Sequence, residues 1–224
     1  MPELTRQGDV FILNLGDGEN RFNPAWVASV REAIAQVGAA DGPRALVTTA
    51  TGKIWSNGLD LDWMGANPEG IPAHVDNVQA AYADLLAAPF PSVAAVQGHC
   101  FAAGAMLALA HDQAFMRADR GFWCLPEVDI HIPFSSGMDA LVRSKLTPAT
   151  ANIAMTTGRR YGGVEAAGAG IVTAALNEDE LLTHAVAVAG ELAPKAGRTL
   201  QKIRSQMYAN AIALLGERDE LDLP

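Results

Sequence analysis

The stretch that decides the fold runs from Val93 to Ala110 and reads VAAVQGHCFAAGAMLALA. It contains no Asp, Glu, Lys or Arg, and it passes from a short β-branched apolar run through Gln97-Gly98-His99 into small residues. This order predicts a buried strand, a tight turn and a buried helix. A helix that begins with small side chains leaves its first N–H groups uncovered, so it can hold a negatively charged oxygen. Close helix packing also favours Ala and Gly, and it is the alternative interpretation.

Strand patterns alternate with helical patterns along the rest of the chain. Strands are expected at residues 10–15, 44–50, 92–97, 114–117, 122–124 and 171–173. Helices are expected at residues 24–38, 72–88, 148–157 and 163–169, from about residue 135, and as a closing pair around 181–192 and 200–214. Asn23 is the expected N-cap of the first helix, with Pro24 at its first position. The alternation predicts an α/β fold with parallel strand pairing.

The composition excludes several classes of protein. Half of the 224 residues are apolar and 18% are charged, which is typical of a globular chain and not of a disordered one. The net charge of −9 argues against a nucleic-acid partner, since no basic run is present to neutralise phosphates. Cys100 and Cys124 have no CxxC spacing, so no zinc site is predicted. Without a signal peptide or an unbroken apolar span, we expect a cytoplasmic protein with no membrane contact.

Three motifs in order carry a resemblance to a known family. They are IWSNGLDL at 54–61, AVQGHCFAAGAML at 95–107 and AAGAGIV at 166–172, with Glu127-Val128-Asp129 between the second and the third. In this set the chain resembles the crotonase superfamily, the enoyl-CoA hydratases and isomerases, over roughly residues 4–175. The sequence around Glu127 is similar to that of the plant-type Δ3,Δ2-enoyl-CoA isomerases.

The resemblance implies both a fold and an oxyanion hole. The fold is a crotonase-type spiral of repeated ββα units at residues 1–175, with a helical extension at 176–224 in the same domain unit. Position by position, the two backbone N–H donors for the thioester oxygen would be Asn57 and Ala103. Such donors each contribute about 3–4 kcal/mol to stabilising an enolate-like oxygen. Ala102 and Ala103 stand where the family usually has glycines, so the hole is expected to be retained in a changed shape.

One departure from the family pattern indicates the reaction. Met106 stands in place of a glutamate that hydratases carry, while the second family glutamate aligns with Glu127. Hydration needs two acid/base groups, whereas one carboxylate suffices to move a double bond from C3 to C2. Apolar neighbours are expected to raise the pKa of Glu127. We therefore predict an isomerase of 3-enoyl-CoA with Glu127 as its base. Two alternatives stay open: a hydratase or other CoA-thioester enzyme, assisted by His131 or Asp129, and an inactive acyl-CoA-binding or assembly module.

The same resemblance gives the expected substrate-binding residues. They are Arg21, Ser56, Gly58, Leu59, Asp60, Gly104, His131 and Phe134. Arg21 would hold phosphates of CoA, and Asp60 would cap the turn that follows it. Other basic residues near the closing helix, including Arg204, are expected at the surface. We expect no metal and no cofactor beyond the CoA of the substrate, and a homotrimer or a dimer of trimers.

Overall fold

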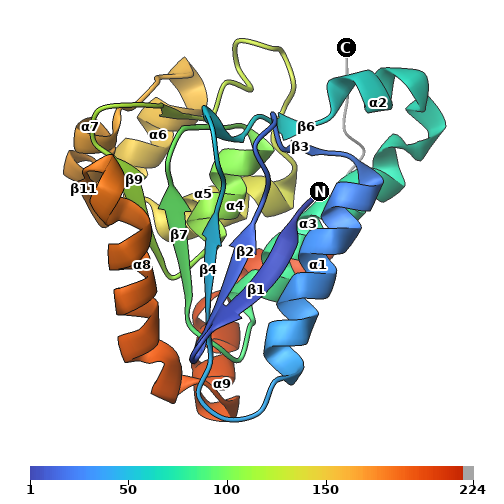
Figure 1. Cartoon of the computed structure of the whole chain (residues 1–224). Helices are drawn as coiled ribbons and strands as arrows, with labels where there is room; N and C mark the ends of the chain where they lie inside the picture. The colour runs from blue at the N-terminus through green and yellow to red at the C-terminus, as the bar shows by residue number, and fades with distance from the viewer. Residues whose placement is uncertain (219–224) are drawn as a thin grey trace.

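Six strands form the central sheet of the protein (Figure 1). The computed structural model describes residues 1–218. The sheet has the order β1-β2-β4-β7-β9-β11. These strands are Glu3–Gln7, Val10–Asn14, Ala45–Thr49, Ser92–Val96, Gln113–Arg117 and Ala174–Leu176. Strand β1 pairs antiparallel with β2, and every other neighbouring pair in this sheet is parallel. The predicted α/β fold with parallel pairing is confirmed.

Helices cover both faces of the inner strands, which explains why β4 and β7 are buried along their whole length, whereas the edge strand β1 is mostly exposed. Leu46 and Ala94 point to a large core shared with α1 (Pro24–Ala39), α3 (Ile71–Leu86) and α4 (Ala103–Ala110). Their chain neighbours Val47 and Val93 point to a second core. That core is closed by α8 (Glu178–Leu192), which lies along the opposite face of the sheet (Figure 1). The expected boundary at residue 175 falls inside β11, and α8 forms one layer of the molecule.

Two smaller sheets bring the motif-bearing segments together. One has the order β10-β8-β5, from Trp123–Cys124, His99–Phe101 and Ile54–Ser56, and the other pairs β3 (Arg21–Phe22) with β6 (Gly58–Leu59). The sequence predicts a strand, a turn and a helix in this order. The structure adds a short strand, β8, between the turn at residues 97–98 and α4. The last strand also begins three residues later than the expected 171–173. In each case the strand is three residues long, which is too short for a clear side-chain period.

The remaining helices lie mostly in the second half of the chain. They are α2 (Leu61–Ala66), η1 (Pro68–Gly70), α5 (Ser136–Lys145), α6 (Pro148–Thr157), α7 (Gly163–Gly168), η2 (Ala193–Lys195), α9 (Arg198–Met207) and α10 (Ala209–Leu215). Asn23 caps α1 as predicted, since its side chain accepts a hydrogen bond from the Trp26 N–H at 3.0 Å. Within residues 1–218, no helix is long and apolar enough to cross a membrane.

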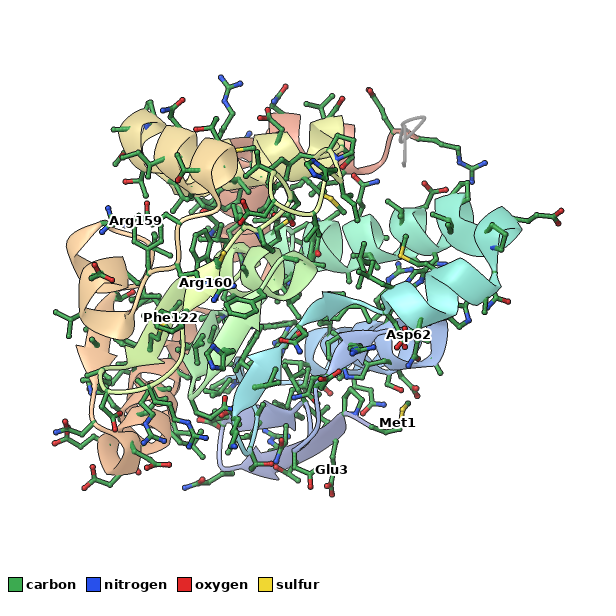
Figure 2. All side chains as sticks on the ribbon, turned by 90° about the horizontal axis from the view of Figure 1, so that it is seen from above. Met1, Glu3, Asp62, Phe122, Arg159 and Arg160 are labelled. Carbon is green, nitrogen blue, oxygen red and sulfur yellow. The ribbon has the colours of Figure 1, made fainter. Side chains whose placement is uncertain are left out.

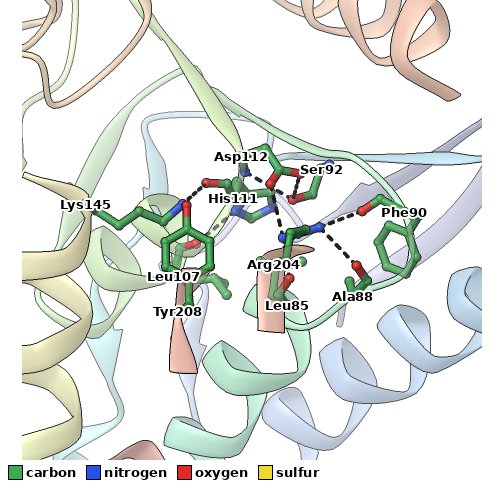
Figure 3. Close-up of polar contacts among 10 residues, drawn as sticks. All are labelled: Leu85, Ala88, Phe90, Ser92, Leu107, His111, Asp112, Lys145, Arg204 and Tyr208. Carbon is green, nitrogen blue, oxygen red and sulfur yellow. Dashed lines mark hydrogen bonds and ion pairs between the residues drawn. The ribbon is translucent and has the colours of Figure 1, made fainter. Parts of the chain in front are cut away.

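A buried guanidinium helps to fix the closing helices to the rest of the fold. Arg204 of α9 is 2% exposed and donates hydrogen bonds to the carbonyls of Leu85, Ala88 and Phe90 at 2.6, 3.2 and 2.7 Å (Figure 3). The carboxylate of Asp112 lies 3.3 Å away and balances its charge. The expectation that Arg204 lies at the surface is wrong. Buried carbonyls at and just after the C-terminal end of α3 need hydrogen-bond donors, and the Arg204 side chain supplies them.

Candidate active site

Two turns, one after β5 and one before α4, meet at the candidate site. The Ser56 hydroxyl donates to the Asn20 carbonyl at 2.7 Å and accepts from the Gly58 N–H at 3.1 Å, which fixes the first turn. A Cβ on Gly104 would come within 2.6 Å of the Ser56 Cβ. The turns can therefore approach this closely only because residue 104 is glycine.

The backbone amide of Ala103 is open at this junction. Ala103 is the first residue of α4, so its N–H has no acceptor within the helix. Gly58 has φ +82°, and a Cβ there would lie 2.9 Å from the Ala103 nitrogen. Glycine at position 58 thus leaves the space in front of this amide clear. Ala102, which precedes it, has φ +50°, a conformation that L-residues adopt at a cost of about 1–2 kcal/mol.

The second expected donor is already engaged. The Asn57 N–H donates to the Glu19 carbonyl at 3.0 Å, through the chain segment that leads into β3. An oxyanion at this position would have to share that hydrogen bond or replace it. Asn57 and Ala103 both border the same cavity.

Glu127 lies in a tight loop that follows β10. The carbonyl of Pro126 accepts hydrogen bonds from the N–H groups of Asp129 and Ile130, and the Glu127 carbonyl accepts one from Ile132. The Glu127 side chain is 6% exposed, and its Oε2 atom is buried with no hydrogen-bond partner. Burial raises the pKa of Glu127 from 4.5 to about 7, in the direction expected from the sequence.

An apolar cavity of about 320 Å³, called the inner cavity below, joins these groups. Its lining consists of Asn57, Leu59, Leu61, Met64, Val75, Phe101, Ala102, Ala103, Met106, Pro126, Glu127, Ile130, Ile132, Pro133 and Met138. Glu127 is the one carboxylate in this lining as far as residues 1–218 are concerned. A carboxylate with one oxygen unpartnered in an apolar cavity, beside an open helix-start amide, is suited to removing a proton next to a carbonyl.

Comparisons with known proteins agree with this geometry. A model of the enoyl-CoA hydratase/isomerase family matches residues 6–222. The chain belongs to the enoyl-CoA hydratase/isomerase family. The protein named enoyl-CoA delta isomerase 2, peroxisomal, of Arabidopsis thaliana is 37% identical to it, over 96% of this chain and 95% of that protein. Enoyl-CoA delta isomerase 3 of the same plant is 36% identical, over 93% and 92% of the two chains.

The fold of the family is found in solved structures as well. The crystal structure of an enoyl-CoA hydratase/isomerase family protein from Pseudomonas syringae superposes on this chain with a TM-score of 0.88. The two share 24% identity, and the alignment covers 96% of this chain and 94% of the other. The predicted crotonase fold is thereby confirmed.

Most of the site residues expected from the family motifs lie in the wall of the inner cavity or in the two turns beside it. Asn57, Leu59, Ala103 and Glu127 border the inner cavity. Ser56, Gly58 and Gly104 do not line it; they shape the two turns, as the Ser56 hydrogen bonds and the close approach of Gly104 show.

Besides Ser56, Gly58 and Gly104, four more of the expected substrate-binding residues lie outside the lining of the inner cavity. Asp60 is the N-cap of α2 and accepts from the Trp63 N–H at 3.2 Å. His131 is exposed on a left-handed backbone, φ +58°, so the loop turns it away from the lining. Phe134 lines a neighbouring cavity. For these three, the expected substrate contact within the inner cavity is not found.

The fourth, Arg21, has its charge engaged by acidic neighbours. Its guanidinium lies 2.5 Å from the Glu19 carboxylate and 2.6 Å from that of Asp62. Asp62 is on the opposite side of the molecule from Phe122 and Arg160 in Figure 2. A phosphate at Arg21 would have to displace one of these carboxylates.

Several residues of the site carry no motif and were missed. Tyr82 of α3 donates its hydroxyl hydrogen to the Ala103 carbonyl at 2.9 Å. Burial, and after it the charge of Glu127, raises the pKa of Tyr82. Val75 and Met138 complete the apolar wall from α3 and α5. Their only signal in the sequence is an apolar residue at helical spacing, which looks the same for a cavity wall as for a core.

Proposed function

We propose that this protein is an enoyl-CoA isomerase that converts 3-enoyl-CoA into trans-2-enoyl-CoA with Glu127 as its base. The observation that carries the proposal is the single carboxylate, buried and without a partner at Oε2, in the wall of an apolar cavity that also holds the Ala103 amide. The relatives named enoyl-CoA delta isomerase support it, because they align with nearly the whole chain.

In this mechanism, Glu127 removes a proton from C2 of the acyl group. The negative charge that develops on the thioester oxygen is stabilised by the Ala103 N–H at the start of α4 and by the Asn57 N–H. Glu127, now protonated, returns a proton to C4, and the double bond ends conjugated with the thioester. The pKa of about 7 leaves a substantial ionised fraction at neutral pH while making the carboxylate a stronger base.

The structure also gives a reason why hydration is not favoured. Met106 is 1% exposed and contributes a thioether to the cavity wall. A thioether neither delivers nor accepts a proton, so among the described residues that line this cavity an attacking water would find no second acid/base group beside Glu127.

The test is a comparison of two substrates on the purified protein. We expect conversion of 3-enoyl-CoA, followed by the absorbance of the conjugated thioester, and little or no hydration of trans-2-enoyl-CoA. Glu127→Gln should abolish conversion while acyl-CoA still binds, and Glu32→Gln on the exposed face of α1 is the matched control. Unchanged turnover in Glu127→Gln would rule out the assigned base. Tight acyl-CoA binding by a wild type that converts no enoyl substrate would favour a binding module.

Three finer expectations accompany the proposal. Arg21 is the proposed contact for a CoA phosphate, and its replacement by Ala should raise KM with little effect on kcat. A homotrimer or a dimer of trimers is the proposed assembly; it would cover exposed apolar side chains such as Phe122, Ile203 and Met207, and light scattering tests it. The cytoplasmic location and the absence of a further cofactor stay predictions.

A further inference from the structure

Glu127 lies between two cavities. Besides the inner cavity it lines a second, more open one of about 660 Å³, called the outer cavity below. The outer cavity is bordered by Glu127, Val128, Ile132, Pro133, Phe134, Ser135, Ser136, Asp139, Met155 and Leu214. Ile132 and Pro133 line both cavities, so Glu127 and this short segment form the wall between them.

The two cavities differ in chemistry. The inner cavity is lined almost entirely by apolar side chains, as suits an acyl group. The outer cavity is more open and includes the Asp139 carboxylate, whose side chain is 41% exposed. The Ser135 hydroxyl in its wall is already engaged, since it donates to the Gln79 side chain and accepts from the Met138 N–H. Water is held where a roomy site offers polar partners, so the outer cavity is suited to water.

A bound substrate makes this difference matter. An acyl-CoA in the inner cavity would displace water from the face of Glu127 that meets C2 and C4. The outer cavity would still give the same residue contact with water. From this arrangement, and resting on the proposed function, we propose that Glu127 exchanges its proton with water through the outer cavity while the reaction intermediate is bound.

The steps balance without any further reactant. The Glu127 carboxylate accepts a proton from C2, which leaves the dienolate of the thioester and a neutral carboxylic acid. In D₂O the acid exchanges its proton with water in the outer cavity, giving the deuterated acid and HDO. The deuterated acid then delivers its deuteron to C4, which regenerates the carboxylate and yields trans-2-enoyl-CoA with deuterium at C4.

A pair of variants on one helix tests the route. Met155 of α6 lines the outer cavity, whereas Asn152, one turn earlier, lines only a neighbouring groove with Arg143 and Thr156. Met155→Trp should obstruct the outer cavity, and Asn152→Trp adds the same ring outside it. Leu214→Phe, from α10, is a second obstruction if Met155→Trp fails to fold.

The measurement is the deuterium content at C4 of the product, by mass spectrometry at low conversion in D₂O. We expect deuterium in most wild-type and Asn152→Trp product, and a several-fold lower share in Met155→Trp product at similar turnover. Wild-type product almost free of deuterium, or equal content in both Trp variants, would overturn the proposed route.

A separate reaction keeps this inference distinct from the proposed function. If 3-enoyl-CoA is not converted at all, the isomerase proposal fails. Exchange of the C2 hydrogens of a saturated acyl-CoA in D₂O needs only the base and the amides, and it still compares the same variants. If C2 exchange is slower in Met155→Trp but not in Asn152→Trp, the result supports the outer cavity as the route. If neither the wild type nor any variant shows C2 exchange, the proposed route is refuted.

Discussion

Replacing Glu127 by Gln should stabilise the protein at high pH and leave its stability nearly unchanged at low pH. Folding raises the pKa of this carboxyl from 4.5 to about 7, so the folded state binds the proton more tightly than the unfolded chain. The ionised form therefore opposes folding. The cost is absent below the unfolded pKa, grows as pH rises from 4.5 to about 7, and is complete above that range. At about 1.4 kcal/mol for each pH unit, it reaches about 3 kcal/mol.

The assay is urea unfolding of wild type and Glu127→Gln at about pH 8.5 and about pH 4, outside the two pKa values. Any pH-independent cost of burying the amide cancels between the two pH values. We expect the free energy of unfolding of the variant, relative to wild type, to be higher at the alkaline pH by about 3 kcal/mol. The kcat/KM of the wild type should rise with pH around an apparent pKa near 7. A stability difference that does not change with pH would refute the assigned burial and charge of Glu127.

Three further changes test the turns and the closing helices. Ala102→Gly should raise the free energy of unfolding by about 1 kcal/mol in a thermal or urea melt, because it relieves the left-handed backbone at φ +50°. Gly58→Ala should lower kcat/KM by about 100-fold, since the added methyl lies 2.9 Å from the Ala103 nitrogen; an unchanged value would exclude that amide as a donor. Arg204→Met should cost about 3–5 kcal/mol in urea unfolding, because it removes the counter-charge of Asp112 and the hydrogen bonds to the Ala88 and Phe90 carbonyls; a cost under about 1 kcal/mol would contradict the described network.

The larger elements could be predicted from the sequence because they are long enough to have a period or a cap. The first helix is an example, with Asn23 and Pro24 at its start. The ordered motifs located the two turns and Glu127, since glycines at 58 and 104 are required by close backbone approach. These local requirements are visible in the residue types themselves.

Other features depend on contacts between distant segments and leave no local trace. The Asn57 amide meets the Glu19 carbonyl because the two-residue strands β3 and β6 pair side by side. The burial of Arg204 depends on how α9 meets the end of α3, and its residue type alone indicates a surface position. His131 is exposed in a loop without a regular pattern, so no side-chain period predicts which way it points.

The hydrogen bond between the Asn57 N–H and the Glu19 carbonyl bears on selectivity between ground state and transition state. Exchanging one neutral carbonyl acceptor for another, the thioester oxygen of the substrate, gains little free energy. Exchanging it for an enolate oxygen gains more, because hydrogen bonds to a charged acceptor are roughly twice as strong. An amide that already has a neutral partner thus contributes little to substrate affinity and most of its effect to the rate. Glu19, through its backbone carbonyl alone, would in this way help to make the site complementary to the intermediate.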